Sequence, residues 1–264
     1  MIGRAAPSVL PVEAWTQGDI AVVSPHLDDA ALSLGATIAG LARLGRTVRV
    51  VTPFAGDPDS DAPPNEWERS TGFSSAGESA AARRDEDLHA CALLGAEARW
   101  LPYDARSPDG VEPALRSALE DVDAVLVPAA PCSHDDHELA TRIVLEHLAS
   151  THTIGLYVDQ PYAMWRLLGE TREVGSRSRN ATSLALRRNA TAAYEQPRLR
   201  TSLQPFVTQP PRWHAVPSKP RDLLAKQRSI FAYTSQMRAF SRLMPAGIAL
   251  YEWQWGGEAV AWLT

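Results

Sequence analysis

The sequence predicts an α/β fold, with one domain built on a mostly parallel sheet that has helices on both faces. Short apolar runs alternate with longer helical stretches over residues 19–160, and this alternation is typical of strand-helix-strand units. The chain has 264 residues, of which 45% are hydrophobic, so it can bury one substantial core. We expect a single domain over residues 1–264, with its core at about 19–160 and an irregular C-terminal elaboration at about 160–264 that determines substrate choice.

The first three predicted elements define the topology. Residues 20–24 form an apolar strand, residues 30–44 a helix and residues 48–52 a β-branched strand. Gly45 follows the helix directly, where the missing Cβ suits a C-terminal cap. A strand, a helix and a strand within about 30 residues require a parallel pair with a right-handed crossover, so the fold is expected to be Rossmann-like. The other predicted helices cover 78–94, 111–120, 138–149 and 221–242, and the other predicted strands lie at 100–101, 124–127 and 153–158.

Two long segments lie outside these elements. Residues 55–77 are rich in Pro, Gly, Ser and Asp, a composition typical of a long functional loop or lid. Residues 160–218 are irregular and rich in Arg and Pro, and their positive charge has two explanations. They form either a solvated basic surface that pairs with the acidic 55–77 loop, or a rim that attracts acidic groups of a substrate. We expect the two segments to wall a cleft that admits a bulky substrate.

Composition excludes several classes of protein. The formal net charge of -5 argues against a nucleic-acid or anionic-membrane partner, because both need a basic field. The N-terminal residues lack the apolar core of a signal peptide, and no run approaches the length of a membrane helix, so we expect a cytoplasmic protein. The two cysteines, Cys91 and Cys132, exclude a disulfide framework and a cysteine-based zinc finger. Any metal therefore has to be held by histidine and carboxylate.

Two polar clusters follow two of the predicted strands. His26-Leu27-Asp28-Asp29 comes after the strand at 20–24, and His134-Asp135-Asp136-His137 comes after the strand at 124–127. In an open parallel sheet, ligands bind outside the carboxyl ends of the strands, so the two clusters are expected to converge. Either cluster alone has an ordinary explanation as polar residues that cap a helix. Their occurrence together at the ends of two strands predicts a mononuclear zinc hydrolase.

The expected zinc ligands are His26, Asp29 and His137. A catalytic zinc takes three protein ligands and keeps one position open, and the pKa of its water falls to about 7. The three-residue separation of His26 and Asp29 lets one turn direct both side chains to the same point, while His137 arrives from the other loop.

The remaining residues of the clusters receive other expected roles. Asp28 is free to act as general base, taking a proton during attack on a carbonyl and passing it to the leaving group. His134 is placed to stabilise an oxyanion or to protonate a leaving nitrogen, and Asp136 to orient the imidazole of His134. Asp135 is assigned to solvent or to a helix N-cap.

At these residues the chain resembles the LmbE-like, or PIG-L, family of zinc-dependent N-deacetylases. The family carries a His-x-Asp-Asp element and a later His-x-Asp-His element, which here are residues 26–29 and 134–137. Arg84-Asp85-Glu86 through Leu94-Gly95 is similar to a third family feature. The resemblance covers roughly residues 19–160, with a further short similar segment, an echo of the family pattern, at residues 233–237. Leu27, the Asp159-Gln160-Pro161-Tyr162 stretch and that echo are most similar to the subgroup acting on glycopeptide-antibiotic pseudoaglycones.

The resemblance implies a function and a set of site residues. It implies zinc-dependent hydrolysis of the N-acetyl amide of an amino-sugar glycoconjugate in secondary-metabolite biosynthesis. It also implies His26, Asp29 and His137 as zinc ligands, Asp28 as base, and His134 with Asp136 as the oxyanion pair. Some mycothiol-pathway members have a tyrosine where this chain has Cys132, which leaves a tyrosine donor from that loop in doubt.

Three alternatives stay open. One is an amidase of a mycothiol-type conjugate or of another small amide. A second is a serine hydrolase using Ser24 or Ser133, for which the usual Gly-x-Ser-x-Gly element is missing. The third is a sugar- or metal-binding protein that retains the fold without turnover.

Overall fold

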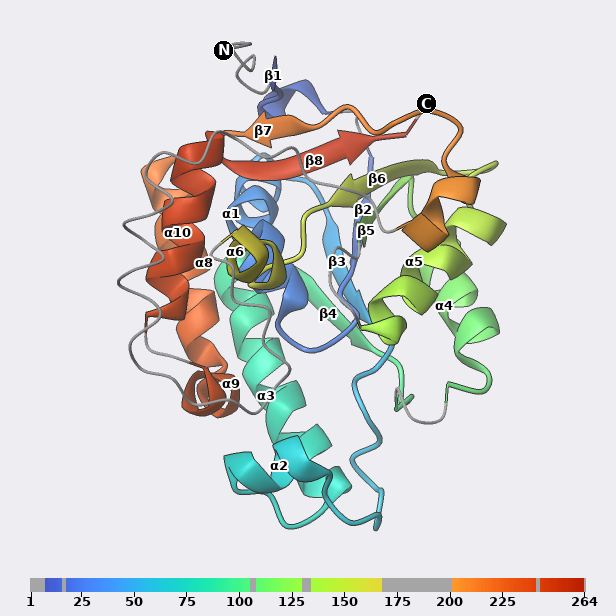
Figure 1. Ribbon diagram of the computed structural model, residues 1–264, viewed down its shortest axis with the longest axis vertical. Helices are drawn as coiled ribbons and strands as arrows, with labels where there is room; N and C mark the ends of the chain where they lie inside the picture. Colours follow the sequence, from blue (N-terminus) through green and yellow to red (C-terminus); the bar gives the residue numbers. More distant parts are fainter. Residues whose placement is uncertain are drawn as a thin grey trace.

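The computed structural model describes residues 8–15, 18–104, 108–129, 134–167, 201–240 and 243–263, and in this part of the chain eight strands form one sheet (Figure 1). Their order across the sheet is β1-β7-β8-β6-β5-β2-β3-β4. Neighbouring strands are parallel except where β8 pairs with β6 and with β7. The predicted α/β class with a mostly parallel sheet is confirmed. The strands are β1 (Ser8–Val9), β2 (Ile20–Val23), β3 (Val48–Thr52), β4 (Glu97–Trp100), β5 (Ala124–Pro128), β6 (Thr153–Tyr157), β7 (His214–Val216) and β8 (Glu258–Trp262).

Helices cover both faces of this sheet. Helices α1, α3 and α8 pack on one face and helices α4 and α5 on the other (Figure 1). The α-helices are α1 (Asp29–Arg43), α2 (Glu66–Thr71), α3 (Ala76–Leu94), α4 (Val111–Leu119), α5 (Asp135–His147), α6 (Tyr162–Leu167), α8 (Pro220–Ala232), α9 (Thr234–Ala239) and α10 (Met244–Trp255). The described residues also contain two 3₁₀ helices, η1 (Val12–Ala14) and η2 (Thr201–Phe206). None of the helices in the described ranges is both long enough and apolar enough to span a bilayer.

Several predicted boundaries need correction. The 55–77 loop contains α2, whose first turn is closed by a capping box in which the Asn65 side chain accepts from the Glu68 amide. Helix α5 begins at Asp135, three residues before the expected 138, because His134 is its N-cap. The predicted helix at 221–242 is divided into α8 and α9 at Tyr233, where ψ is 71°.

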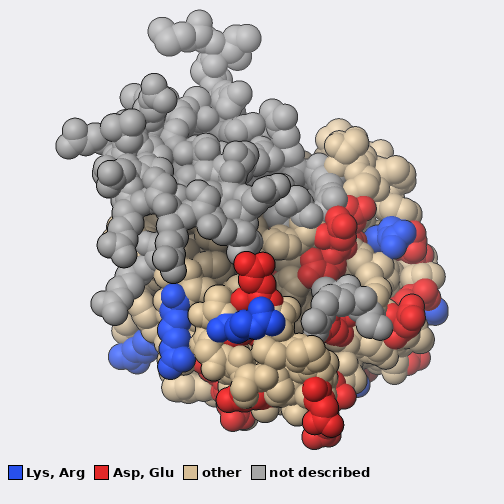
Figure 2. Space-filling model, turned by 60° about the horizontal axis from the view of Figure 1, so that its bottom comes forward, with Lys and Arg blue, Asp and Glu red and all other residues tan. Residues whose placement is uncertain are grey.

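The C-terminal part belongs to the core and is more regular than expected. Strand β8 lies between β7 and β6, and α8 packs against α1 and α3. Most of the Arg-rich segment at 160–218 lies outside the described residues, so its pairing with the acidic 55–77 loop stays a prediction. On the described part of the face in Figure 2, acidic side chains lie among basic ones.

A buried ion cluster joins the C-terminal part to α1. The Lys226 Nζ donates to Glu252 Oε1 at 2.5 Å and to Glu258 Oε1 at 2.6 Å. Glu258 also accepts from the backbone amides of Ala36 and Thr37, at 3.0 and 2.7 Å. Both amides lie in the interior of α1, and Gly35 beside them leaves room for the stem of Lys226. The cluster therefore ties α1, α8, α10 and β8 together.

Burial also changes the protonation of this cluster. Desolvation raises the pKa of Glu252 to about 8, although the charge of Lys226 opposes the shift. Desolvation lowers the pKa of Lys226, but the charges of Glu252 and Glu258 outweigh it and the net shift is upward. With its pKa near 8, Glu252 carries a proton at neutral pH.

We predict that Glu252→Gln changes the pH dependence of stability. Because the folded state holds a proton on Glu252 up to about pH 8 while the unfolded state releases it near 4.5, the free energy of unfolding of the wild type falls as pH rises through this window. The variant has no group that titrates at this position, so its free energy of unfolding should not show this decrease. Between pH 5 and 8 the difference in free energy of unfolding between variant and wild type should therefore shift in favour of the variant by more than about 1 kcal/mol. Urea unfolding at several pH values measures the free energy of unfolding of the variant and of the wild type. Glu66→Gln, on an exposed part of α2, is the control and should follow the wild type; a parallel course for Glu252→Gln would contradict the assignment.

Candidate metal centre

The turn between β2 and α1 is held by hydrogen bonds that involve Ser24. Its hydroxyl donates to the His26 carbonyl at 2.6 Å and accepts from the Ala30 amide at 2.9 Å. The His26 amide in turn donates to Asp29 Oδ2 at 2.8 Å. These bonds bring His26 and Asp29 to the same side of the turn. They also occupy the Ser24 hydroxyl, which argues against Ser24 as a nucleophile; Ser133 lies outside the described residues.

The second cluster begins helix α5. His134 occupies the N-cap position and Asp135, exposed to solvent, is the first helical residue. His137 is completely buried, and its amide donates to Asp136 Oδ1 at 3.1 Å. Because β2 and β5 pair in parallel, with Val22 opposite Leu126, the two clusters emerge at the same edge of the sheet.

Three ligand atoms form a compact triangle at this edge. His26 Nδ1 lies 3.2 Å from His137 Nε2 and 3.4 Å from Asp29 Oδ2, and His137 Nε2 lies 3.3 Å from Asp29 Oδ2. Tetrahedral zinc binds N and O ligands at about 2.0–2.2 Å, which separates neighbouring ligand atoms by about 3.3–3.6 Å. The donor types and the spacing of these three residues therefore fit a tetrahedral metal ion.

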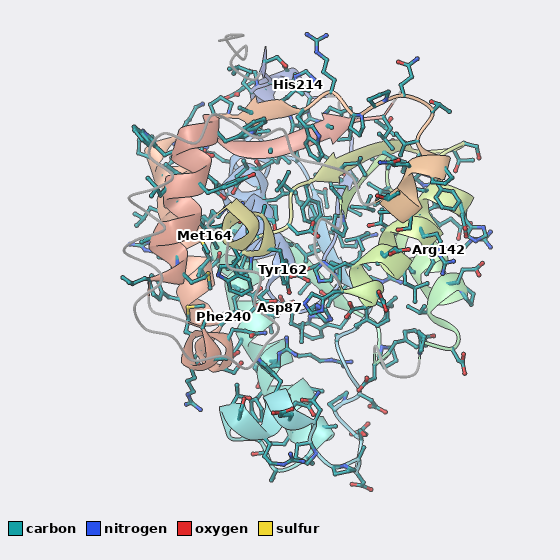
Figure 3. The ribbon with its side chains drawn as sticks, in the orientation of Figure 1. Asp87, Arg142, Tyr162, Met164, His214 and Phe240 are labelled. Carbon is teal, nitrogen blue, oxygen red and sulfur yellow. The ribbon has the colours of Figure 1, made fainter. Side chains whose placement is uncertain are left out.

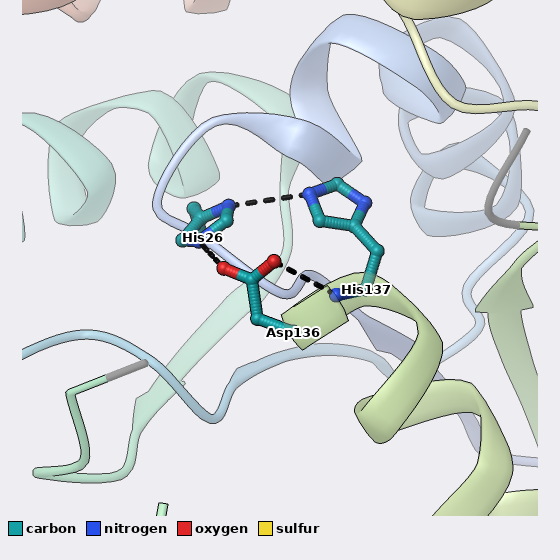
Figure 4. A group of neighbouring side chains, drawn as sticks. All are labelled: His26, Asp136 and His137. Atoms are coloured by element: carbon teal, nitrogen blue, oxygen red, sulfur yellow. Dashed lines mark hydrogen bonds and ion pairs between the residues drawn. The ribbon is translucent and has the colours of Figure 1, made fainter. Parts of the chain in front are cut away.

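Asp136 contacts the other nitrogen of His26. Its Oδ2 forms a short ion pair with His26 Nε2, and a ligand atom from each of His26, Asp136 and His137 lies within 4.8 Å of the others (Figure 4). Asp136 was expected to orient His134, and the structure places it against His26 instead. A carboxylate on the far nitrogen fixes the tautomer and orientation of a metal-binding imidazole. Asp136 is therefore placed to orient His26, a candidate metal ligand.

Asp159 is a site residue that sequence reasoning did not assign. It follows β6, the strand next to β5, and its Oδ2 lies 3.3 Å from His137 Nδ1. The residue is fully buried and gives His137 the same kind of carboxylate partner that Asp136 gives His26. The position of Asp159 at the carboxyl end of a third parallel strand was the signal that would have identified it.

The carboxylates and imidazoles of the site shift one another's pKa values. Burial lowers the pKa of His26, but hydrogen bonds to Asp136 and Asp29 outweigh it and raise the pKa to about 10. Burial also lowers the pKa of His137, but the charge of Asp29 outweighs this effect and the net shift is upward. In both residues the surrounding carboxylates favour a positive charge at the point where a metal ion would supply one.

His134 lies beside the triangle. Its ring centroid is 5.6 Å from that of His137 and 5.1 Å from that of Tyr162. Burial, followed by the charge of His137, lowers the pKa of His134, so the ring is neutral at pH 7. A neutral imidazole at this position can donate a hydrogen bond to an oxygen that gains negative charge.

Asp28 has an unusual backbone conformation. Its φ is 134° and its ψ is -29°, and among the described residues it is the only one other than glycine with a positive φ. The side chain is 5% exposed and makes no cap hydrogen bond to α1. Burial and then the charge of Asp29 raise its pKa well above the ordinary value, while Arg83 opposes the shift. Strained residues cluster at functional sites, and a buried carboxylate next to the triangle is suited to act as a base.

The first prediction from this geometry concerns metal content. Replacing His26, Asp29 or His137 by Ala should each lower the metal content of the purified protein, because these side chains form the triangle. His134→Ala and Asp28→Ala should keep the metal, since both lie beside it. Elemental analysis after gel filtration measures the difference. Loss of metal from His134→Ala with retention in His137→Ala would reverse the two histidine roles.

The second prediction concerns strain at Asp28. Glycine adopts a positive φ without strain, whereas the same φ costs any other residue about 1–3 kcal/mol. Asp28→Gly should therefore be about 1 kcal/mol more stable than Asp28→Ala, even after the larger unfolded-state entropy of glycine is counted. Urea unfolding of both variants with a chelator present makes the comparison free of metal. Equal stability would show that the backbone is relaxed.

Comparison with known proteins agrees with this fold. Residues 21–148 match the family model described as PIG-L: GlcNAc-PI de-N-acetylase. None of the curated proteins matches the chain significantly. A solved triple mutant of the deacetylase in the teicoplanin biosynthetic pathway is 23% identical, covers 93% of this chain and 98% of its own, and has a TM-score of 0.68. A solved A40926 pseudoaglycone deacetylase is 24% identical, with coverages of 93% and 96% and a TM-score of 0.65.

A third solved structure is the zinc-inhibited form of teicoplanin deacetylase, which is 22% identical and has a TM-score of 0.67 over 93% of this chain and 98% of its own. At this level of identity the three structures establish a shared fold. The matched residues 21–148 include both clusters and the strands β2 and β5 that position them. The resemblance seen in the two motifs is thus confirmed, and residues 21–148 of the chain are similar to the PIG-L family.

Proposed function

We propose that the protein is a zinc-dependent N-deacetylase that hydrolyses the N-acyl amide, acetyl in the simplest case, of an amino-sugar glycoconjugate in secondary-metabolite biosynthesis. The observation that carries the proposal is the triangle of His26, Asp29 and His137 with the buried carboxylate of Asp28 beside it. This combination of three ligands and an adjacent base is the arrangement that metal-assisted amide hydrolysis needs.

The residues divide the chemistry among them. His26, Asp29 and His137 would hold the zinc, which would supply Lewis acidity that lowers the pKa of water to about 7 and polarises a carbonyl. Asp28 accepts the proton that water loses as its oxygen attacks the acyl carbon, and then donates it to the nitrogen when the C–N bond breaks. His134 donates a hydrogen bond to the carbonyl oxygen as its charge increases. The products are a carboxylate and a free amine.

The solved structures support the substrate class. The teicoplanin-pathway deacetylase and the A40926 pseudoaglycone deacetylase act in glycopeptide-antibiotic chemistry by their descriptions, and the family description names a de-N-acetylase of an amino sugar. Both support the expected small-molecule glycoconjugate substrate. Zinc as the metal is supported by the two-histidine, one-carboxylate donor set.

The test is acetate release from an N-acetylglucosaminide that carries an aromatic aglycone. Activity should disappear on chelation and return with stoichiometric zinc. Asp28→Asn should lower kcat by about 10²–10⁴-fold while it retains zinc, because the substitution removes the base and leaves the ligands. Asp135→Asn, which alters an exposed carboxylate of the second cluster, is the matched control and should keep wild-type activity. Acetate release that continues at the same rate after chelation, or full activity in Asp28→Asn, would refute the mechanism.

A further inference from the structure

The segment that joins β6 to α6 contacts both histidines of the second cluster. Asp159 at its start lies 3.3 Å from Nδ1 of the candidate ligand His137. Tyr162 at its end packs its ring against His134, with centroids 5.1 Å apart and planes at 61°, and against His137 at 5.4 Å and 86°. Figure 3 shows Tyr162 near the centre of the molecule. One short segment therefore touches a metal-binding histidine and the histidine beside it.

The backbone next to Tyr162 is held by two buried hydrogen bonds. The Gln160 amide donates to Ser33 Oγ of α1 at 2.9 Å. The Gln160 side chain accepts from the Met164 amide, in the first turn of α6, at 3.3 Å. Gln160 itself is buried. Because these bonds fix the backbone from which the Tyr162 ring projects, the ring is a rigid neighbour for the histidines.

His134 needs a fixed orientation if it is to stabilise an oxyanion. An imidazole rotates broadly about χ2, whereas a hydrogen bond weakens steeply as its angle departs from linearity. Asp136, the residue expected to orient His134, uses Oδ2 on His26 and Oδ1 on the His137 amide. The Tyr162 ring meets His134 edge to face, which is a favourable arrangement of two aromatic rings and adds no negative charge beside the imidazole.

From these contacts we infer that Tyr162 is a positioning residue for His134, whose imidazole it holds in the orientation that donates to the carbonyl oxygen of the substrate. The inference rests on the proposed function, in which His134 is that donor. The face and edge of the ring make the contact, so phenylalanine can replace Tyr162, whereas an aliphatic side chain cannot.

The first measurement compares Tyr162→Leu with Tyr162→Phe in the zinc-loaded enzyme, on the N-acetylglucosaminide with an aromatic aglycone. Tyr162→Leu should lower kcat about 10–100-fold and change KM less than about threefold, because a misaligned donor weakens the transition state more than substrate binding. Tyr162→Phe should stay within about twofold of the wild type, since it keeps the ring. Both variants should retain zinc in elemental analysis. Tyr251→Leu, which alters another half-buried tyrosine, in α10, is the matched control and should keep the wild-type kcat.

The second measurement determines whether Tyr162 acts through His134. His134→Ala alone should lower kcat about 10²–10³-fold. Adding Tyr162→Leu to His134→Ala should lower kcat no further, because the side chain that the ring positions is already missing. A residue that only stabilises the fold would cause the same loss in both backgrounds. If Tyr162→Leu does not fold, Tyr162→Met replaces the ring by a flexible apolar side chain and serves in both comparisons.

Four results would overturn the inference. They are a wild-type kcat in Tyr162→Leu, equal losses in Tyr162→Leu and Tyr162→Phe, loss of zinc from Tyr162→Leu, and a full additional loss in the His134→Ala background. The second would assign the effect to the hydroxyl, the third to His137, and the fourth to an action independent of His134. All four leave the proposed function intact, because the wild-type enzyme still releases acetate only with zinc. If the wild type releases no acetate, the proposed function fails and the inference fails with it.

Discussion

The parallel pairing of β2 with β5 is the constraint on which the metal centre depends. The two strands are adjacent in the sheet but about 100 residues apart in the chain, with Ile20 opposite Ala124. Because a parallel register points both strands the same way, the turn after β2 and the start of α5 have to meet. A shift of one residue in this register would turn the buried side chains of either strand to the other face, and the triangle of His26, Asp29 and His137 would come apart.

The electrostatics of the site follow from that convergence. Asp29, Asp136 and Asp159 surround two buried or half-buried histidines, a concentration of negative charge that is unfavourable without a compensating cation. Protons on the histidines provide compensation in the metal-free protein, since the pKa values of both His26 and His137 are raised. A divalent ion would displace these protons, so the same carboxylates that orient the imidazoles also favour metal binding.

Sequence reasoning predicted the parts of the site that depend on strand ends. The strand predicted at 124–127 and the two clusters were recognisable because apolar runs and turn-forming residues alternate there. The contact of Asp136 with His26 depends on side-chain rotamers, which residue spacing does not determine. The interruption at Tyr233 arises from a tertiary contact, because its hydroxyl donates to the buried Asp87 at 2.6 Å while the helical periodicity continues past it. Strand β7 was missed because three residues are too few to show a period of two.

The cluster of Lys226, Glu252 and Glu258 has a consequence for the order of events during synthesis. Strand β8 carries Glu258 and covers one side of β6, yet it is made after every other strand. A nascent chain that has not reached residue 258 leaves two interior amides of α1 and the ammonium group of Lys226 without their carboxylate, and it exposes an edge of β6 to other chains. The part of the sheet beyond β6, formed by β8, β7 and β1, is thus assembled only after β8 has been synthesised, which makes the partly synthesised chain a natural client for chaperones.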